Sequence, residues 1–332
     1  MTAAVTFFLG EGDVEVLRRL DPDRDWRELQ LGERAWILQT YLRLARAGCA
    51  VELAASPPAE GIVVFHAKQA PALRRQWRRL RNTILLAVRA DYRPPLIADF
   101  EVVQNGCFAD EKRCFFIPHW PQPALMPREA SRAAAIRRIA FKGFEQNLHP
   151  EFRSPDWREF LAAHGIEWEI DAVPFAGAAT DRLGTEWPDF RQVDLVLAVR
   201  PDYHYLWTSK PATKLLNAWL AGVPALLGPE AAYRELRRSE LDYLEVDSLE
   251  AAKAAVLRLL AQPALYHAMV ENGRIRGAEF SAEATVARWA DLLTRKIPAL
   301  AASRNNRWFP LPVRTAGRWL RRMATQRPRT AG

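Results

Sequence analysis

The sequence predicts an α/β protein made of two doubly wound, Rossmann-like domains, and three observations lead to this fold class. Short apolar segments alternate with amphipathic ones along most of the 332 residues, which is the pattern of parallel strands joined by helical crossovers. A chain of this length is suited to two domains. Four prolines between residues 118 and 127 interrupt the alternation, and such a cluster is typical of a linker.

The first half reads as one parallel sheet with its helices. We predict strands over 5–9, 51–55, 61–65, 83–88, 101–103 and 114–117, and helices over 32–47 and 71–80. Gly48 follows the last periodic residue of the first helix, where a helix end favours glycine. Pro57 and Pro58 stop the second strand. The linker is predicted over 120–129.

The second half repeats the alternation. We predict a helical start over 130–138, strands over 139–141, 167–170, 194–199, 223–227 and 243–246, and later helices over 156–163, 249–260, 263–273 and 282–293. Ser154 or Asp156 is suited to cap the helix at 156. The predicted division is an N-terminal domain over 1–128, a C-terminal domain over 129–300 and a basic helix or tail over 301–332.

The net charge of +8 is confined to the end of the chain. Residues 304–332 contain eight arginines and no acidic residue, so the remainder is formally neutral. A neutral body argues against nucleic-acid binding, which needs a basic face on the fold itself. Three scattered cysteines are too few for a disulfide framework or a zinc site, and we expect them to be reduced and buried.

Polar side chains recur directly after the predicted strands of the first half. They are Glu11, His66, Lys68, Arg89, Asp91, Asn105 and His119. Each alone is an ordinary cap or turn residue. Because the carboxyl ends of parallel strands line one edge of a sheet, their recurrence favours a shared ligand crevice.

The chain is organised around the stretch from Ser209 to Glu230. Apolar residues at helical spacing, including Leu215 and Trp219, predict a short helix that Gly222 ends, and 223–227 is a buried strand. Polar residues gather at the helix start: Ser209, Lys210, Thr213, Lys214 and Asn217. Free N–H groups, the positive end of the helix dipole and two lysines favour a bound phosphate. A plain αβ unit with solvated lysines is the alternative.

This stretch resembles the donor-binding segment of GT-B glycosyltransferases, in which a loop, a helix ending A-x-G-x-P and a strand bind the diphosphate of a nucleotide sugar. Many retaining members carry two glutamates, E-x7-E, across the segment. Here Ser209 and Asn217 occupy those two places. The departure puts the retaining mechanism and the sugar contacts in doubt, whereas the added cations favour a phosphate site.

The resemblance extends to the order of elements over most of the chain. Residues 32–53 resemble the first helix and second strand of the acceptor half, and Phe141-Lys142-Gly143 resembles the first strand and loop of the donor half. It implies two domains facing across a cleft. It also implies a donor diphosphate site made of Lys142, Gly143, Arg200, Lys210, Thr213, Lys214, Asn217 and Glu230. Fixed cations and a helix start stabilise a leaving diphosphate without a metal.

An inverting transfer needs a general base. Asp91 and His66 are the candidates because both follow strands of the first sheet. Glu11 and His119 are weaker candidates. The alternatives are a turn carboxylate paired with Arg89 or Arg93 and a capping surface imidazole. A retaining transfer would need no such base.

Two basic segments stand apart from this site. Five arginines between 74 and 81 flank Trp77 and read as a solvated face or an anionic acceptor surface. In the tail, Val313, Ala316, Leu320 and Met323 repeat at helical spacing opposite arginines. That pattern fits a helix lying on anionic lipid, or the terminal helix that braces the first domain in GT-B enzymes.

The predicted activity is metal-independent transfer of a sugar from a nucleoside-diphosphate sugar to a glycan, lipid or small-molecule acceptor. The nucleotide sugar is a substrate, and no cofactor is expected. A nucleotide-sugar epimerase of the same architecture and a non-catalytic nucleotide-sugar-binding protein are the alternatives. Without a signal peptide or an apolar run of about 18 residues, we expect a cytoplasmic protein, with peripheral contact at the inner membrane face as one reading of the tail.

Overall fold

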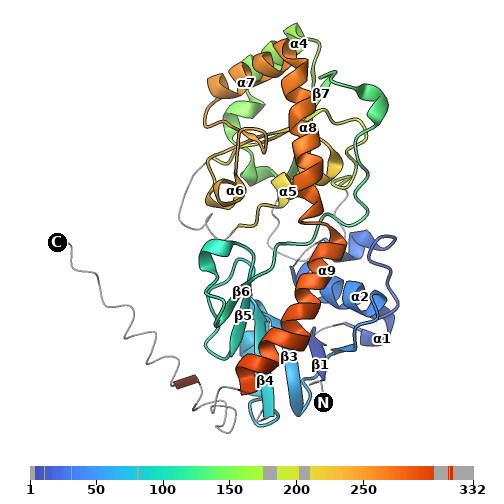
Figure 1. Ribbon diagram of the computed structural model, residues 1–332, viewed down its shortest axis with the longest axis vertical. Coiled ribbons are helices and arrows are strands. Elements are labelled where there is room, and N and C mark those ends of the chain that lie inside the picture. The colour runs from blue at the N-terminus through green and yellow to red at the C-terminus, as the bar shows by residue number, and fades with distance from the viewer. Residues whose placement is uncertain are drawn as a thin grey trace, which may run out of the picture. The chain divides into compact units, whose positions relative to one another are not determined.

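The computed structural model describes residues 4–10, 12–30, 32–80, 82–174, 185–201, 210–302, 313, 315 and 316. The chain forms two compact units, coloured along the sequence in Figure 1. Within the described residues, unit 1 takes those up to 22, 32–117 and 286 onward, and unit 2 takes 23–30 and 118–285. Compared with the predicted boundaries, residues 23–30 belong to unit 2 and residues 286–302 belong to unit 1.

Unit 1 contains a six-stranded sheet in the order β2-β1-β3-β4-β5-β6, and every neighbouring pair is parallel. The strands are β1 (Val5–Phe8), β2 (Val51–Ala54), β3 (Glu60–His66), β4 (Asn82–Val88), β5 (Phe100–Val103) and β6 (Cys114–Phe116). Residues 62–66 and 85–88 are buried without interruption, as expected for parallel strands covered on both faces. The predicted strands of this half are confirmed.

The helices of unit 1 come from both ends of the chain. They are α1 (Val14–Leu17), α2 (Gln39–Arg46), α3 (Ala70–Arg75), α9 (Ala282–Asp291, from Val286 on) and α10 (Ile297–Ala302), with π-helical turns at Arg34–Leu38 and Leu292–Lys296. Trp289 is fully buried, and its ring lies 6.3 Å from that of Phe7 on β1. This packing explains why the second part of α9 belongs to unit 1. The helix predicted over 71–80 is shorter than expected, since turns replace it after Arg75.

Unit 2 contains a five-stranded parallel sheet in the order β11-β10-β9-β7-β8. Its strands are β7 (Arg138–Phe144), β8 (Glu167–Val173), β9 (Leu195–Ala198), β10 (Ala225–Leu227) and β11 (Leu244–Glu245). Its helices are α4 (Pro155–Ala163), α5 (Thr213–Ala221), α6 (Ala231–Leu236), α7 (Leu249–Ala261) and α8 (Pro263–Ala278). Ser154 caps α4 through its hydroxyl. The helix predicted over 130–138 is only a 3-10 turn at Ala130–Arg132, because Ala133 takes a φ of 44°.

Helix α5 is fixed in unit 2 by close packing on α8, which runs beside it in Figure 1. Trp219 donates its indole N–H to the carbonyl of Asp242 at 2.8 Å. A Cβ at Gly273 on α8 would come within 3.1 Å of the Trp219 ring, so this glycine permits the close approach. Gly222 ends α5 in the left-handed conformation, with a φ of 69°, as the sequence predicts. The rigid placement of α5 also fixes the residues at its start.

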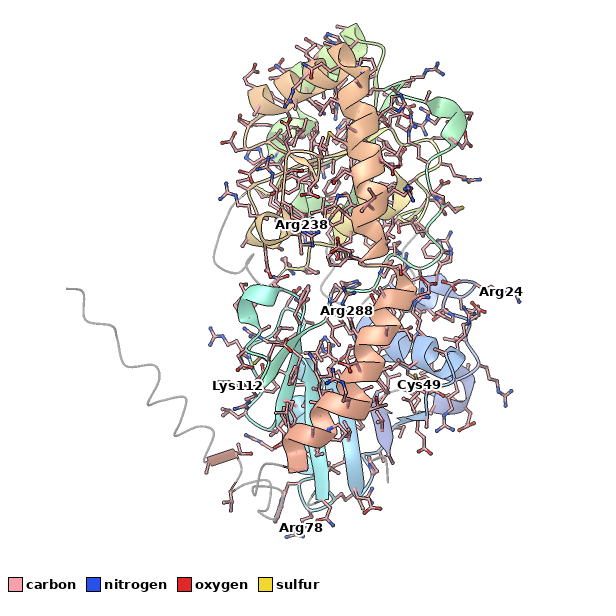
Figure 2. The ribbon with its side chains drawn as sticks, in the orientation of Figure 1. Arg24, Cys49, Arg78, Lys112, Arg238 and Arg288 are labelled. Atoms are coloured by element: carbon pink, nitrogen blue, oxygen red, sulfur yellow. The ribbon has the colours of Figure 1, made fainter. Side chains whose placement is uncertain are left out.

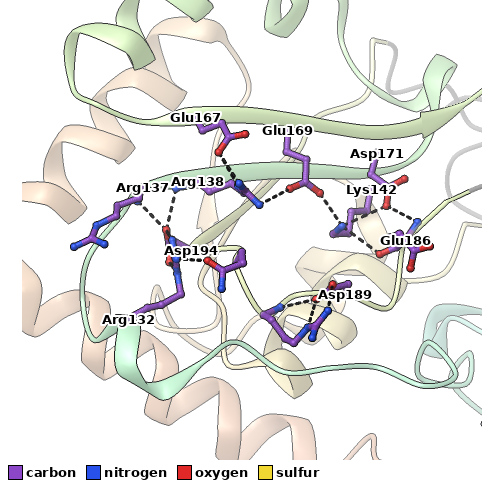
Figure 3. Close-up of polar contacts among 12 residues, drawn as sticks. Arg132, Arg137, Arg138, Lys142, Glu167, Glu169, Asp171, Glu186, Asp189 and Asp194 are labelled. Carbon is purple, nitrogen blue, oxygen red and sulfur yellow. Dashed lines mark hydrogen bonds and ion pairs between the residues drawn. The ribbon is translucent and has the colours of Figure 1, made fainter.

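A buried ionic network ties the starts of β7 and β9 together (Figure 3). The Asp194 carboxylate is fully buried and accepts from the Arg128 and Arg132 guanidinium groups at 2.9 and 2.7 Å. It also accepts from the backbone N–H groups of Arg137 and Arg138. Burial alone would raise the pKa of Asp194, but these hydrogen bonds lower it below its usual value. The network is structural, since it lies at the edge where the strands begin.

The cysteines differ from expectation in one respect. All three are free thiols, as predicted, but Cys107 is exposed, and Cys49 and Cys114 are only half-buried. Burial raises the pKa of the Cys114 thiol to about 11. Cys107 is exposed because it lies in a short 3-10 turn, Gly106–Phe108, rather than in a strand.

Candidate functional site

Several predicted donor-site residues meet at one edge of the unit 2 sheet. Gly143 lies near the end of β7, Arg200 follows β9 and Glu230 follows β10. Because these strands are parallel neighbours, their carboxyl ends share one edge, which is where ligands bind in such sheets. Helix α5 begins at Thr213, close to the same edge, and Lys214 is its second residue. The structure therefore brings Gly143, Arg200, Lys214 and Glu230 to one edge of the sheet.

The Lys214 side chain is the most distinctive feature of this edge. Its Nζ lies 5.3 Å from the centre of the Phe141 ring. A Cβ at Gly143 would come within 2.8 Å of the same Nζ, so only glycine leaves room for the ammonium group. Among the residues that the structure describes, this ammonium has no hydrogen-bond or ion-pair partner. Within the described residues, it is an amine at the ligand edge of the sheet that no carboxylate directly contacts.

The surroundings of Lys214 disfavour its charged form. Burial, and then the nearby Arg200 guanidinium, lower the pKa of Lys214 to about 7, against the opposing effect of Glu230. Lys210 contributes in the same direction as Arg200. An anion placed beside Lys214 would reverse this effect, because an opposite charge favours the ammonium form.

Arg200 and Glu230 form a second, buried part of the site. Arg200 donates from Nε to the Glu230 carboxylate at 2.8 Å and from Nη1 to the Asn147 side-chain oxygen at 2.6 Å. Tyr233 is fully buried beside them, and burial raises its pKa. The other carboxylate oxygen of Glu230, Oε1, is buried and accepts no hydrogen bond within the described part of the chain. A buried acceptor of this kind is costly unless a ligand or water satisfies it.

The start of α5 lacks a cap from the described residues. Since no side chain among them caps the helix at Ala212, its first N–H groups are suited to an anion. Lys210 and Thr213 are half-buried at this start. Asn217, one turn further on, is buried, and its Oδ1 accepts from the backbone N–H of Gln122 at 3.0 Å. Asn217 therefore fastens the linker, and its carbonyl oxygen is already engaged.

Lys142 has partners other than those the prediction gave it. The strand continues to Phe144 rather than ending at Phe141, so Lys142 lies within β7, and its side chain points to the face opposite Phe141 and Gly143. Its Nζ bonds the carboxylates of Glu169 and Asp171 on β8 at 2.9 and 3.3 Å (Figure 3). The charge of Lys142 is thus compensated within the sheet.

A wide pocket of about 700 Å³ adjoins the same edge of unit 2. It is lined by residues that follow three strands: Glu145, Gln146, Leu148, Pro150, Arg153, Pro174 and Pro201. None of these residues is among those predicted from the sequence. The sequence could have indicated them, because the loop after β7 directly follows Lys142-Gly143, which is predicted to bind the donor.

The two candidate bases lie together in unit 1. His66 ends β3 and is buried, and Asp91 follows β4 and is exposed. The Asp91 carboxylate accepts from the Gln104 amide at 3.3 Å. Burial lowers the pKa of His66 to about 4, although Glu33 and Asp91 oppose this effect. The imidazole is therefore neutral near pH 7.

The tautomer of His66 follows from its hydrogen bond. Its Nδ1 accepts from the backbone N–H of Lys68 at 3.3 Å. A ring nitrogen that accepts must be unprotonated, so the single proton of the neutral ring is on Nε2. In that form Nε2 can donate but cannot accept a proton. Of the weaker candidates, His119 belongs to unit 2, where its Nδ1 bonds the Trp120 carbonyl, and Glu11 lies outside the described residues.

Two kinds of feature are absent from the described residues. No group of three or more His, Cys, Asp or Glu side chains there could hold a metal ion. Within the same residues, no helix is both long and apolar enough to cross a membrane. Ser209 lies outside the described residues, as does most of the arginine-rich tail.

The architecture resembles that of solved glycosyltransferases over nearly the whole chain. Sucrose-phosphate synthase from Thermosynechococcus elongatus matches with a TM-score of 0.62 at 14% identity, over 90% of this chain and 100% of that one. AviGT4, a glycosyltransferase involved in avilamycin A biosynthesis, matches with a TM-score of 0.52 at 16% identity, over 90% and 98% of the two chains. This chain has the GT-B glycosyltransferase fold.

A third structure with the GT-B fold extends the comparison. Anabaena Alr3699/HepE, solved in complex with UDP and glucose, matches with a TM-score of 0.51 at 13% identity, over 88% of this chain and 99% of that one. No protein-family model and no curated protein sequence matches the chain. At these identities the GT-B likeness concerns the fold, and the activity has to be argued from this chain's own residues.

Proposed function

We propose that the protein is a glycosyltransferase that moves a sugar from a nucleoside-diphosphate sugar to an acceptor. The observation that carries this proposal is the Lys214 ammonium, held over Phe141 and against Gly143 at the start of α5. A lysine amine at the ligand edge of a parallel sheet, with no carboxylate of the described residues in contact, is suited to an anionic ligand. The GT-B fold and the UDP bound in Alr3699/HepE support a nucleoside diphosphate as that ligand.

The proposed chemistry is stabilisation of the leaving group. When the bond between the sugar and the diphosphate breaks, negative charge develops on the terminal phosphate. Lys214, Lys210 and the first N–H groups of α5 are fixed before the reaction, so they stabilise this charge with little reorganisation. We therefore propose that the transfer needs neither a metal ion nor a cofactor, the nucleotide sugar being a substrate.

Glu230 is proposed to position the donor. Its Oε2 is held by Arg200, and its buried Oε1 is a vacant acceptor. A hydroxyl group of the donor sugar or ribose would satisfy that oxygen and remove its desolvation cost. Asn217 is proposed to contribute at most its side-chain NH2 group, since the Gln122 N–H already uses its Oδ1. Lys142 is left out of the proposed site because Glu169 and Asp171 already bind its ammonium group.

Asp91 is the better of the two candidate bases for an inverting transfer. Its carboxylate is exposed and able to accept a proton from an acceptor hydroxyl. His66 is buried and carries its proton on Nε2, so we propose that it supports the strand end rather than acting as the base. The cation site and this base lie in different units of the chain.

The test is a binding screen with UDP, GDP, ADP and dTDP, followed by release of the bound nucleotide from its sugar conjugate with and without acceptors. We expect one nucleotide to bind the wild type, and Lys214→Ala to weaken it about 10- to 100-fold, because a charged hydrogen bond contributes about 1.5–3 kcal/mol. Lys253→Ala is the matched control, since Lys253 is paired with Asp156 and Glu250 elsewhere in unit 2.

Three results would count against the proposal. The first is a protein that binds none of the four nucleotides. The second is equal binding by the Lys214→Ala and wild-type proteins. The third is conversion of the nucleotide sugar without any acceptor, which would indicate an epimerase.

A further inference from the structure

Unit 1 carries a dense group of exposed arginines whose charges are not compensated. Arg74 and Arg75 end α3, and Arg78 and Arg79 lie in the turns before β4. All four are exposed, and Arg78 is labelled at the margin of unit 1 in Figure 2. Among the described residues, none of the four forms an ion pair. We call these four residues, together with Trp77, the arginine patch.

Exposed arginines without an ion pair also occur elsewhere in the described residues, at Arg19, Arg93, Arg137, Arg158 and Arg237, but those five are scattered along the sequence. Other exposed arginines of the described part pair with a neighbouring acid, as Arg274 does with Glu271 and Arg295 with Asp291. Glu60, which begins the adjacent strand and is in register with Asn82, forms no ion pair with the patch. The body of the chain is formally neutral, so the patch is a local excess of charge rather than part of a basic surface. Four like charges within six residues repel one another unless a partner neutralises them.

Trp77 gives the patch an amphipathic character. It packs against the buried cluster beneath the sheet, which includes Leu73 and Leu80, and stays half-buried. The Arg78 guanidinium lies 5.4 Å from the centre of the Trp77 ring. An aromatic ring beside arginines is the composition that favours the interface between lipid headgroups and water.

We propose that the arginine patch docks the protein on an anionic lipid surface. A lipid surface offers many negative headgroups without a fixed arrangement, and four exposed arginines can bind them without a ligand of defined shape. A nucleic-acid interface is larger, about 600–1,000 Å² even for a single module, and follows a basic groove or stripe. The neutral remainder of the body supplies no such stripe.

The sequence provides a second basic segment that would act together with the patch. The eight arginines between 304 and 329 follow α10, whose residues belong to unit 1. Stable attachment to a membrane usually takes two weak signals. The docking proposal rests on neither the nucleotide site nor the transfer reaction, since every residue of the patch lies in unit 1.

The experiment is sedimentation of the full chain with vesicles of phosphatidylcholine alone or with phosphatidylglycerol added. One variant replaces the four patch arginines by glutamine. The matched control replaces four exposed, ion-paired arginines and changes the net charge equally: Arg191, Arg238, Arg274 and Arg295. A third variant replaces the eight tail arginines by glutamine.

Each basic residue near an anionic leaflet raises partitioning about fivefold. We expect the patch variant to bind anionic vesicles roughly 600-fold more weakly than the wild type, and the control to lose less than about threefold. Wild-type binding should fall as salt is raised, and neutral vesicles should bind little. The circular dichroism spectrum and the urea unfolding midpoint serve as the folding check and should be unchanged in all variants.

The proposal is overturned by any of four outcomes. They are anionic-vesicle binding by the patch variant at the wild-type level, an equal loss in the paired control, loss only when the tail is changed, and tighter binding to a duplex or single-stranded oligonucleotide than to anionic vesicles. The last would assign the patch to nucleic acid.

Discussion

Raising the pH from about 6 to about 8.5 should weaken the binding of UDP-glucose, because Lys214 has to be protonated to bind the diphosphate. With a pKa of about 7 in the free protein, Lys214 is about 90% charged at the lower pH and about 3% charged at the higher one. If the bound diphosphate keeps the ammonium charged, the affinity falls about 30-fold across this range. The charge of the ligand's diphosphate does not change over this pH range, because the diphosphate is esterified at both ends.

The same reasoning predicts that binding takes up a proton. At about pH 7.5 roughly three quarters of the free protein lacks the Lys214 proton, so each bound ligand should draw about 0.7–0.8 proton from the buffer. Titration calorimetry in two buffers of different ionisation enthalpy measures this number directly. The Lys214→Arg variant is the control, because a guanidinium stays charged throughout and should give a flat profile.

The reasoning would be refuted by an affinity that stays constant between about pH 6 and 8.5, with no proton taken up. It would also be refuted by an unchanged pH profile in a Lys214→Met protein, because the titrating group would then lie elsewhere. A drop in affinity shared by Lys214→Arg would assign the titration to another residue.

Four further predictions concern single residues. Lys214→Met should stabilise the protein by about 1–3 kcal/mol near pH 7 while weakening nucleotide binding, because the unfolded lysine binds a proton more strongly than the folded one. For the same reason, the free energy of unfolding of the wild type should increase as the pH rises from about 7 towards 10.5. Urea titrations at several pH values measure both effects. Gly143→Ala should weaken nucleotide binding at least about 10-fold, because the added Cβ would displace the Lys214 ammonium. The φ of Gly143, 153°, is also one that alanine rarely adopts. An unchanged affinity would show that the ammonium does not contact the ligand. Asp194→Asn should lower the free energy of unfolding by about 3–5 kcal/mol, since two buried guanidinium groups lose their counter-ion, and a loss below about 1 kcal/mol in urea denaturation would contradict this. For an inverting reaction, Asp91→Asn should lower kcat at least about 100-fold with little change in KM, whereas His66→Gln should retain most of the kcat, and the reverse ranking would make His66 the base.

The main architecture could be predicted because its signals are local. Apolar runs mark the strands, and Gly222 marks the end of α5 with a left-handed residue that a helix end favours. The convergence of Gly143, Arg200 and Lys214 also followed from the sequence, because parallel strands bring their carboxyl ends to one edge. These inferences need only chain order and strand polarity.

The remaining features depend on contacts between distant segments. The sequence does not say that β8 lies beside β7, and so the pairing of Lys142 with Glu169 and Asp171 could not be foreseen. The bond from Gln122 to Asn217 joins residues 95 positions apart. The membership of Trp289 in unit 1 depends on packing against Phe7. In each case the deciding partner is set by tertiary structure rather than by local pattern.

The most direct test of the central claim is a crystal structure of the protein with the nucleoside diphosphate that the binding screen selects. The account predicts a phosphate oxygen at about 3 Å from the Lys214 Nζ, with the diphosphate at the start of α5. A diphosphate bound away from Lys214 and α5, with the Lys214 ammonium still lacking an anionic partner, would contradict it.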